Sequence, residues 1–237
     1  MTKRADRSAF EAAKAEMAGS VDRRGDLCSP FLGLLPVTGA SVALLGERVG
    51  QSTIAASDDI AARLDELQFD LGEGPCWEAL ATRHPVLAPN IVTHQTSLWP
   101  TFSDTLRADV IGERVGGMFA FPLAVGNLDL GAIDLYTAQP LELSPAQVAD
   151  ASVLATLASW QVLRLVLADT EFDPAAAPGI RPRREVHQAT GMVLAQLGVS
   201  ADDAALLIRA HAFASGRSVF DVSVDVIERR LDFSEEG

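Results

Sequence analysis

The stretch Gly117-Met-Phe-Ala-Phe-Pro-Leu-Ala-Val-Gly-Asn-Leu-Asp-Leu-Gly-Ala-Ile-Asp-Leu-Tyr136 contains two strand-like runs on either side of the dipeptide Gly126-Asn127. Apolar and aromatic runs that flank a glycine-containing turn indicate a β-hairpin. A second hairpin is expected upstream, where residues 41–45 and 52–56 are joined through residues 46–50. The two hairpins predict one antiparallel sheet.

Helical patterns flank these hairpins. Ser144-Pro145-Ala-Gln147 has a capping serine, a proline at the first helical position and a glutamine that can reach back to the cap. The helix that follows, from Pro145 to Leu167, carries apolar residues at spacings of three and four. A similar stripe predicts an N-terminal helix through Leu27, Phe31, Leu34 and Leu35. Helices packed on one face of an antiparallel sheet predict an α+β domain.

A proline-rich stretch separates this region from the rest of the chain. Residues 171–184 place three prolines and a glycine between two helical patterns, and prolines there stop a helix and hold the chain extended. We therefore expect a helical or flexible segment at 1–19, an α+β domain at 20–170, a linker at 171–182 and a helical domain at 183–233.

The segment after the linker shows three short helical patterns. The first has an apolar stripe and ends at Gly198, the second opens at Ser200 and stops at Gly216, and the third opens at Ser218. The first stripe is formed by Val186, Ala189, Val193 and Leu197. Short helices joined by short turns predict a small three-helix bundle.

Composition limits the class of protein. With 237 residues, of which 48% are apolar, the chain is expected to be packed and globular. The N-terminus has no apolar stretch long enough for a secretory signal, and the run Val162–Leu167 is short and broken by Arg164, so we expect a cytoplasmic protein without a membrane partner.

The net charge of −13 is unevenly distributed. Residues 1–180 hold 12 basic and 23 acidic side chains, whereas residues 181–237 hold 7 and 9. A strongly acidic protein is not a general binder of nucleic acids or anionic membranes, because such partners favour a basic surface. The C-terminal part is therefore the less repulsive one toward a polyanion.

Cysteine and histidine usage gives no sign of a metal or cofactor. Cys28 and Cys76 are too few for a disulfide framework or a zinc site built on thiolates. The four histidines have no ligand spacing, so metal binding is not expected, and His211 is interpreted as a core or interface residue.

The sequence of the last segment resembles an ANTAR domain. The resemblance is carried by Val186-His-Gln-Ala-Thr-Gly-Met-Val-Leu-Ala-Gln-Leu-Gly-Val-Ser200, followed by the pairs Ala212-Phe213, Gly216-Arg217 and Asp221-Val222. It covers nearly all of residues 183–231. What the resemblance implies is that a dimer binds a structured RNA leader, usually paired hairpins that compete with a terminator.

Two departures from the family pattern remove positive charge. Thr190 stands where the family often has lysine, and Ala195-Gln196 stands where it commonly has arginine. Because phosphate contacts supply much of nucleic-acid affinity, we expect weaker or more salt-sensitive binding. The residues expected to contact RNA are Arg183, Arg184, Gln188, Thr190, Gly191, Gln196, Arg209 and Arg217. The arginines at 181, 183 and 184 are equally compatible with a solvated linker.

The first domain, from about Ser20 to Ala168, resembles the GAF domains that precede ANTAR domains in actinobacterial regulators. The resemblance rests on residues 71–76 (Leu-Gly-Glu-Gly-Pro-Cys), Trp99-Pro100, Phe121-Pro-Leu123 and Gly131-Ala-Ile-Asp-Leu-Tyr136. GAF domains bind cyclic nucleotides, tetrapyrroles, small metabolites or no visible ligand, so the fold names no ligand.

The candidate ligand-binding residues of this domain are Cys76, Trp77, Trp99, Phe119 and Phe121. Cys76 is expected at the start of a helix, where the thiol pKa falls and redox or covalent sensing becomes possible. Its alternative role is that of a small buried apolar residue. The aromatic residues either line a small-molecule pocket beside the sheet or fill the core.

The helix from Pro145 to Leu167 has apolar residues beyond those needed to cover the sheet. A second face with Leu154, Trp160, Leu163 and Val166 predicts a parallel homodimer through paired helices. The alternative is that the N-terminal helix covers both faces of this helix.

These observations give one functional hypothesis and two rivals. In the hypothesis, a non-enzymatic antitermination regulator senses a ligand or redox state in the GAF domain, and this signal changes how two ANTAR bundles bind RNA hairpins. The first rival is a protein-interaction adaptor that never touches RNA. The second is a thiol-dependent reductase of GAF fold that acts on methionine sulfoxide, which would need more clustered cysteines than Cys28 and Cys76.

Overall fold

The computed structural model divides the chain into two compact units, Met1–Arg181 and Pro182–Gly237. Each unit is considered by itself below. The residues that the structure describes are 2–19, 27–46, 50–91, 99–168 and 184–234. The expected linker at 171–182 lies outside these residues.

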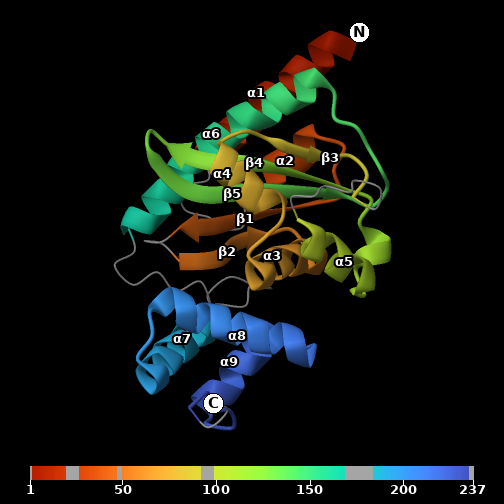
Figure 1. The fold of residues 1–237 in the computed structure, drawn as a ribbon. Coiled ribbons are helices and arrows are strands. Elements are labelled where there is room, and N and C mark those ends of the chain that lie inside the picture. The colour runs from red at the N-terminus through yellow and green to blue at the C-terminus, as the bar shows by residue number, and fades with distance from the viewer. Residues whose placement is uncertain (1, 20–26, 47–49, 92–98, 169–183, 235–237) are drawn as a thin grey trace. The chain divides into compact units, whose positions relative to one another are not determined.

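The first unit is built on a five-stranded sheet in the order β2-β1-β5-β4-β3 (Figure 1). Both expected hairpins are confirmed, since β1 pairs with β2 and β4 pairs with β5, all antiparallel. Antiparallel pairing of β1 with β5 joins the hairpins, and the short strand β3, which was not expected, extends the sheet beyond β4. The strands are β1 (Gly39–Gly46), β2 (Gly50–Ala56), β3 (Val86–Ala88), β4 (Gly117–Val125) and β5 (Leu128–Thr137).

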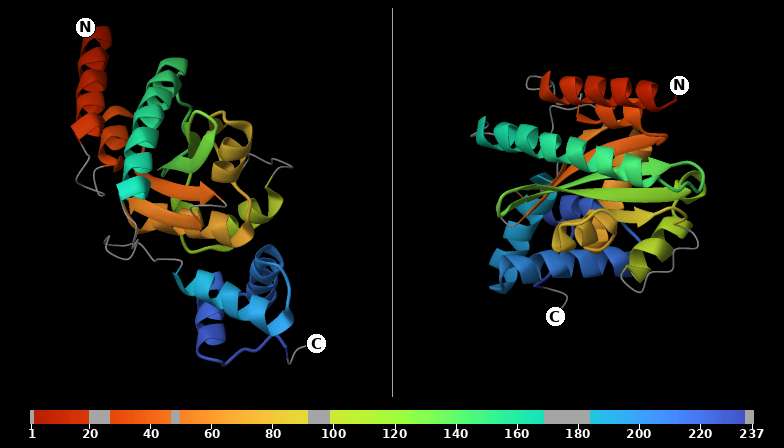
Figure 2. Two further views of the ribbon diagram at one scale, coloured as in Figure 1. Left: turned by 90° about the vertical axis from the view of Figure 1, so that its left-hand side faces the viewer. Right: turned by 90° about the horizontal axis from the view of Figure 1, so that it is seen from above.

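Helices cover both faces of this sheet, so the expectation of helices on one face is wrong. The helices α1 (Thr2–Gly19), α2 (Ser29–Leu34) and α6 (Pro145–Ala168) lie on one side (Figure 2). On the other side lie α3 (Asp59–Leu71), α4 (Pro75–Thr82) and α5 (Pro100–Ala108), and the 3-10 turn η3 (Gly112–Arg114) follows α5. The reason is that β4 is apolar at consecutive positions from Met118 to Phe121, so both of its faces must be covered.

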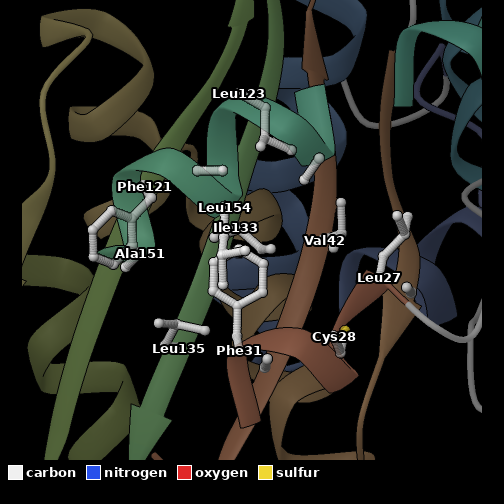
Figure 3. Packing of buried hydrophobic residues seen from close by; sticks show 14 of the residues in the cluster. Leu27, Cys28, Phe31, Val42, Phe121, Leu123, Ile133, Leu135, Ala151 and Leu154 are labelled. Carbon is white, nitrogen blue, oxygen red and sulfur yellow. The ribbon is translucent and has the colours of Figure 1, made fainter. Parts of the chain in front are cut away.

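Alternation along the strands separates two hydrophobic cores. Phe121, Ile133 and Leu135 point toward α2 and α6, where they pack around Phe31 (Figure 3), and Phe119 belongs to the same core. The intervening residues of the same strands, Met118, Ala120 and Tyr136, pack with α3 and α5 instead. Successive side chains of a strand point to opposite faces, so residue parity decides which core each one enters.

Local signals set the helix ends in this unit. The Asp58 carboxylate accepts hydrogen bonds from the Ile60 and Ala61 amides, both 2.9 Å long, and opens α3. The predicted capping box opens α6, with the Gln147 side chain accepting from the Ser144 amide at 2.8 Å. The helix expected through Leu35 is shorter, because α2 ends at Leu34, whereas the segment at 1–19 contains the helix α1.

The long helix α6 belongs to the core of the first unit. By length and composition its stretch Pro145–Leu167 is apolar enough to cross a bilayer, with a mean hydropathy of 1.2. It packs instead on β4, where Ala151, Leu154 and Ala158 are fully buried. At a register shift in β4, the Ser159 hydroxyl accepts the Ala124 amide at 3.1 Å and ties the helix to the sheet.

The second unit is the expected three-helix bundle of α7 (Arg184–Leu197), α8 (Ala201–Ser215) and α9 (Val219–Ile227). Ser200 and Ser218 cap α8 and α9 by accepting backbone amides at 3.1 and 3.0 Å. Gly198 and Gly216 adopt left-handed φ values of 67° and 63° after α7 and α8. The core consists of Ala189, Val193, Ala204, Ile208, Ala212, Val219, Val222 and Val226.

Candidate functional site

The five candidate ligand-binding residues do not line one site. Phe119 and Phe121 are fully buried in the core beneath α6. Trp99, Cys76 and Trp77 lie on the opposite side of the sheet, among residues of α3, α4 and β1. One pocket cannot therefore be formed by all five, because the sheet separates the two phenylalanines from the other three residues. Whether Trp77 or Trp99 contacts a ligand stays a prediction.

Cys76 lies near the start of α4, as expected, but burial rather than the helix N-terminus dominates the pKa of its thiol. The residue is fully buried, and desolvation together with the nearby carboxyls of Asp134 and Asp65 raises the thiol pKa well above its ordinary value. Cys28 belongs to the core on the other side of the sheet, and burial raises its thiol pKa to about 12. The thiolate reactivity expected of Cys76 is therefore opposed by its surroundings.

A buried polar cluster that sequence reasoning missed lies beside Cys76. The carboxyl of Asp65 in α3 accepts the hydroxyls of Ser41 and Thr53, each at 2.7 Å. The first hydroxyl comes from β1 and the second from β2, and all three residues are buried. These bonds fix α3 to the edge of the sheet.

Gln68 connects the cluster to β5 and α4. Its amide nitrogen donates to the Asp134 carboxyl at 2.7 Å, and its amide oxygen accepts the Cys76 backbone amide at 2.8 Å. The indole of Trp77 donates to the Gln68 backbone carbonyl at 2.8 Å. The side chain of Gln68 leaves no room for a Cβ atom at Gly74, which explains the glycine just before α4.

Asp65 and Asp134 form a carboxyl pair that must hold a proton. Within the described residues, the hydrogen bonds that either carboxyl receives come from neutral groups, and Asp134 Oδ1 receives none. Burial, first of all, raises the pKa of Asp65 to about 7 and raises that of Asp134 well above its ordinary value, and the charge of Asp65 raises it further. A proton on Asp134 that is donated to Asp65 satisfies both groups. The signal in the sequence was an aspartate inside the apolar strand Gly131-Ala-Ile-Asp-Leu-Tyr136.

No group of three or more His, Cys, Asp or Glu side chains within the described ranges is arranged to hold a metal ion.

In the second unit, the outer face of α7 presents some of the residues expected to contact RNA. Gln188 and Gly191 are exposed one turn apart. The Thr190 hydroxyl instead donates to the Val186 carbonyl at 2.7 Å, and the Gln196 side chain accepts the Phe233 amide at 3.4 Å. The structure therefore brings Gln188 and Gly191 to one surface, whereas Thr190 and Gln196 make contacts within the domain.

The arginines expected to contact RNA differ in whether they form ion pairs within the protein. Arg217 forms an ion pair with Asp225 at 2.6 Å, and Asp225 also binds Arg230. Arg209 forms no ion pair with any residue that the structure describes. Arg183 and the side chain of Arg184 lie outside the described residues. The pair Arg229-Arg230 after α9 is a further exposed basic element that sequence reasoning missed.

Packing among the described residues of the bundle does not require a glycine at position 191. Gly191 lies in the middle of α7, and a Cβ atom added there would have no neighbour within 4 Å in the described structure. Glycine in a helix interior costs about 1 kcal/mol relative to alanine. A glycine that weakens its helix without serving packing is expected where another molecule approaches the backbone closely.

The outer face of α6 exposes large apolar residues at a spacing of seven. Val153, Trp160 and Leu167 are 43%, 51% and 73% exposed. Leu154, which was expected on this face, is instead fully buried against the sheet. The N-terminal helix α1 covers another side of α6, where the Gln161 side chain donates to the Met17 carbonyl at 3.2 Å. The helix α1 does not cover Trp160, which remains half-exposed.

Comparison with known proteins identifies the second unit. Residues 180–227 match the ANTAR domain family. No curated protein sequence is significantly similar to the chain.

Solved structures resemble the first unit. The GAF domain of a phosphoenolpyruvate-protein phosphotransferase from Acinetobacter superposes with a TM-score of 0.53 at 14% identity, covering 70% of this chain and 96% of that one. The corresponding GAF domain from Coxiella burnetii gives a TM-score of 0.53 at 11% identity, over 69% and 95%. A free methionine-R-sulfoxide reductase from Neisseria meningitidis reaches a TM-score of 0.47 at 12% identity over 69% and 92%, which is too distant for a functional comparison.

The fold of the first unit and the family of the second define a two-domain protein in which an α+β domain of GAF fold precedes a three-helix domain. The chain combines a domain of GAF fold with an ANTAR domain, a family known as an RNA-binding antitermination module.

Proposed function

We propose that this protein is a cytoplasmic, signal-responsive antitermination regulator whose ANTAR domain binds RNA hairpins. The observation that carries the proposal is the match of residues 180–227 to the ANTAR family, and the glycine of α7 supports it because it lies open on the surface. The GAF-fold domain senses a small ligand of unknown chemistry. A redox signal read by Cys76 is less well supported, because its thiol is buried and its pKa is raised.

The test is RNA binding by the full-length chain as a function of salt. The probe is a pool of tandem RNA hairpins with fixed stems and randomised loops, selected on the protein at low salt. For the selected RNA, affinity should fall steeply with salt, because each neutralised phosphate releases counterions. Arg209→Gln should reduce the magnitude of the log–log salt slope by about 1. Arg83→Gln in the first unit removes an equal charge and should leave the slope unchanged.

A protein-interaction adaptor is the second candidate, and the acidic balance of the chain favours it. If no RNA is enriched from the pool, or if the salt slope is flat and indifferent to Arg209, the adaptor becomes the better explanation.

Gly191→Ala should stabilise the ANTAR domain and weaken RNA binding at the same time. Alanine has a higher helix propensity than glycine, which should raise the stability of the domain by about 1 kcal/mol, and its methyl group has room in the described structure. The same methyl group should obstruct the close approach of RNA to α7. Hydrogen exchange of the α7 amides measures the first effect, and affinity for the selected RNA measures the second. Gly33→Ala, at an exposed glycine of α2 with equally open space, is the matched control and should leave RNA affinity unchanged. Unchanged affinity in Gly191→Ala would exclude this part of α7 from the interface.

We further propose that the protein is a homodimer paired through the outer face of α6. A spacing of seven between Val153, Trp160 and Leu167 is that of a helix that packs on a parallel copy of itself. Trp160→Glu should convert the dimer into a monomer in sedimentation equilibrium, because a carboxylate would be buried at the centre of the pair. Val110→Glu, at an apolar residue that is 92% exposed outside α6, should not change the mass.

A further inference from the structure

Phe213 is the one large aromatic ring of the ANTAR domain that the described structure leaves in water. It lies on the outer face of α8 and is 68% exposed, whereas its neighbour Ala212 is buried in the bundle. Phe233, by contrast, packs edge-on against His211 with ring centroids 5.6 Å apart. An exposed phenylalanine contributes nothing to the core, so Phe213 is available to a partner.

The surroundings of Phe213 suit a flat, anionic partner. Arg209 precedes it by one helical turn and shares its face of the helix, and it forms no ion pair with a described residue. Ala210, which precedes the ring by three residues on this face, and the adjacent Ala214 are exposed and small. From Ala204 to Ser215 the helix has no acidic residue. An exposed aromatic ring thus lies one helical turn from a cation.

We propose that Phe213 is a stacking platform for one unpaired loop base of the RNA, with Arg209 placed to bind the phosphate beside that base. This inference rests on the proposed RNA-binding function. Proteins read RNA sequence mainly at unpaired loop bases, which they stack on aromatic rings and arginine planes. The alternative occupant is an apolar protein surface, which would use the exposed Leu206 on the same helix as much as Phe213.

The experiment uses the full-length chain, the selected hairpin RNA and three variants. Phe213→Trp keeps an aromatic ring at this position, whereas Phe213→Leu keeps an apolar side chain without a ring. Leu206→Ala is the control, because it removes another exposed apolar side chain of α8 and leaves Phe213 in place. We expect Phe213→Leu to weaken binding by about tenfold or more, and Phe213→Trp to retain it. The salt slope should be the same in all three, since none removes a phosphate contact. Circular dichroism checks that helix content is unchanged.

Removal of single loop bases identifies the stacked base. An abasic substitution at that position should weaken binding to the wild type as much as Phe213→Leu does, and should cause no further loss in the Phe213→Leu variant. If Phe213→Leu binds as well as the wild type, the stacking proposal is wrong although RNA binding stands. If Leu206→Ala and Phe213→Leu weaken binding equally and no abasic position couples to Phe213, the surface is an apolar docking site and the proposal is also wrong. If the pool yields no enriched RNA, the proposed function fails and this inference fails with it.

Discussion

Gly131→Ala is expected to destabilise the GAF-fold domain strongly. Gly131 of β5 has φ +156° and faces Leu44 of β1, so an added Cβ atom would overlap the backbone carbonyl of Ala43. The obstructing atom is backbone at the centre of the sheet, and it can move only if the pairing of β1 with β5 is broken. We expect a loss of about 4 kcal/mol or more in the free energy of unfolding.

Urea unfolding followed by tryptophan fluorescence measures this loss, since Trp77, Trp99 and Trp160 all belong to the first unit. Gly126→Ala is the matched control. Gly126 also has positive φ, at +60°, but an added Cβ atom would meet nothing within 4 Å there, so about 1 kcal/mol of backbone strain is expected. Equal losses in the two variants would show that the close approach at Gly131 does not govern stability.

Asp134→Asn is expected to stabilise the same domain at neutral and higher pH. The pKa of Asp65 is about 7 in the folded chain against an ordinary value of 3.8, and burial raises the pKa of Asp134 well above its ordinary value. The folded chain therefore holds protons that the unfolded chain has released. This contribution is fully present below about pH 4 and is lost as the pH rises through the folded pKa values, at about 1.4 kcal/mol per pH unit for each proton held.

Asparagine at position 134 removes this dependence, because its amide is neutral at every pH. It can still accept from Gln68 and can donate to Asp65 in place of the proton. We expect a gain of about 2 kcal/mol at pH 8 and a flatter stability profile between pH 5 and pH 8. Urea unfolding across this range measures both effects.

Two further variants separate the pair from general charge effects. Asp65→Asn should cost about 1–3 kcal/mol, because one amide oxygen cannot replace both carboxylate oxygens that accept Ser41 and Thr53. Asp104→Asn changes a highly exposed carboxylate and should leave the profile as it is in the wild type. A steep profile that survives in Asp134→Asn would contradict a shared proton.

Most of the ANTAR domain and both hairpins could be predicted because their signals are local. The serines at 200 and 218 cap helices by contacts within three residues, and Gly198 ends α7 through its own backbone angle. The turn at Gly126 likewise joins strands that are neighbours in sequence. Such caps and turns are determined by residues close to them in the sequence.

The second layer of helices and the buried cluster depend on contacts between distant segments. The apolar run from Met118 to Phe121 indicated a strand, and its lack of alternation was the sign that both faces are covered. Asp65 and Asp134 come from different elements, and only the fold brings their carboxyls together. In the sequence, neither aspartate can be distinguished from an ordinary polar residue.

The candidate ligand residues show the same limit. Phe119 and Phe121 lie two residues apart on β4, so both side chains point to the same face of the sheet and enter the core beneath α6. Which face they point to depends on how β4 pairs with its neighbours, and the sequence alone does not show this. For Cys76 the helix start was predicted correctly, but the depth of burial, which decides the direction of its pKa shift, was not visible in the sequence.

The helix α6 buries one face against the sheet and exposes apolar residues on the other, and this restricts the movements by which it could transmit a signal. Each residue turns the helix by about 100°, so a rotation of that size would carry Leu154 into water and drive Trp160 toward the sheet. The Ser159 hydroxyl, held to the Ala124 amide, opposes the same movement. Axial twisting is thus disfavoured, so in the proposed homodimer a change at the sheet would reach the second copy through tilting or sliding of the whole helix.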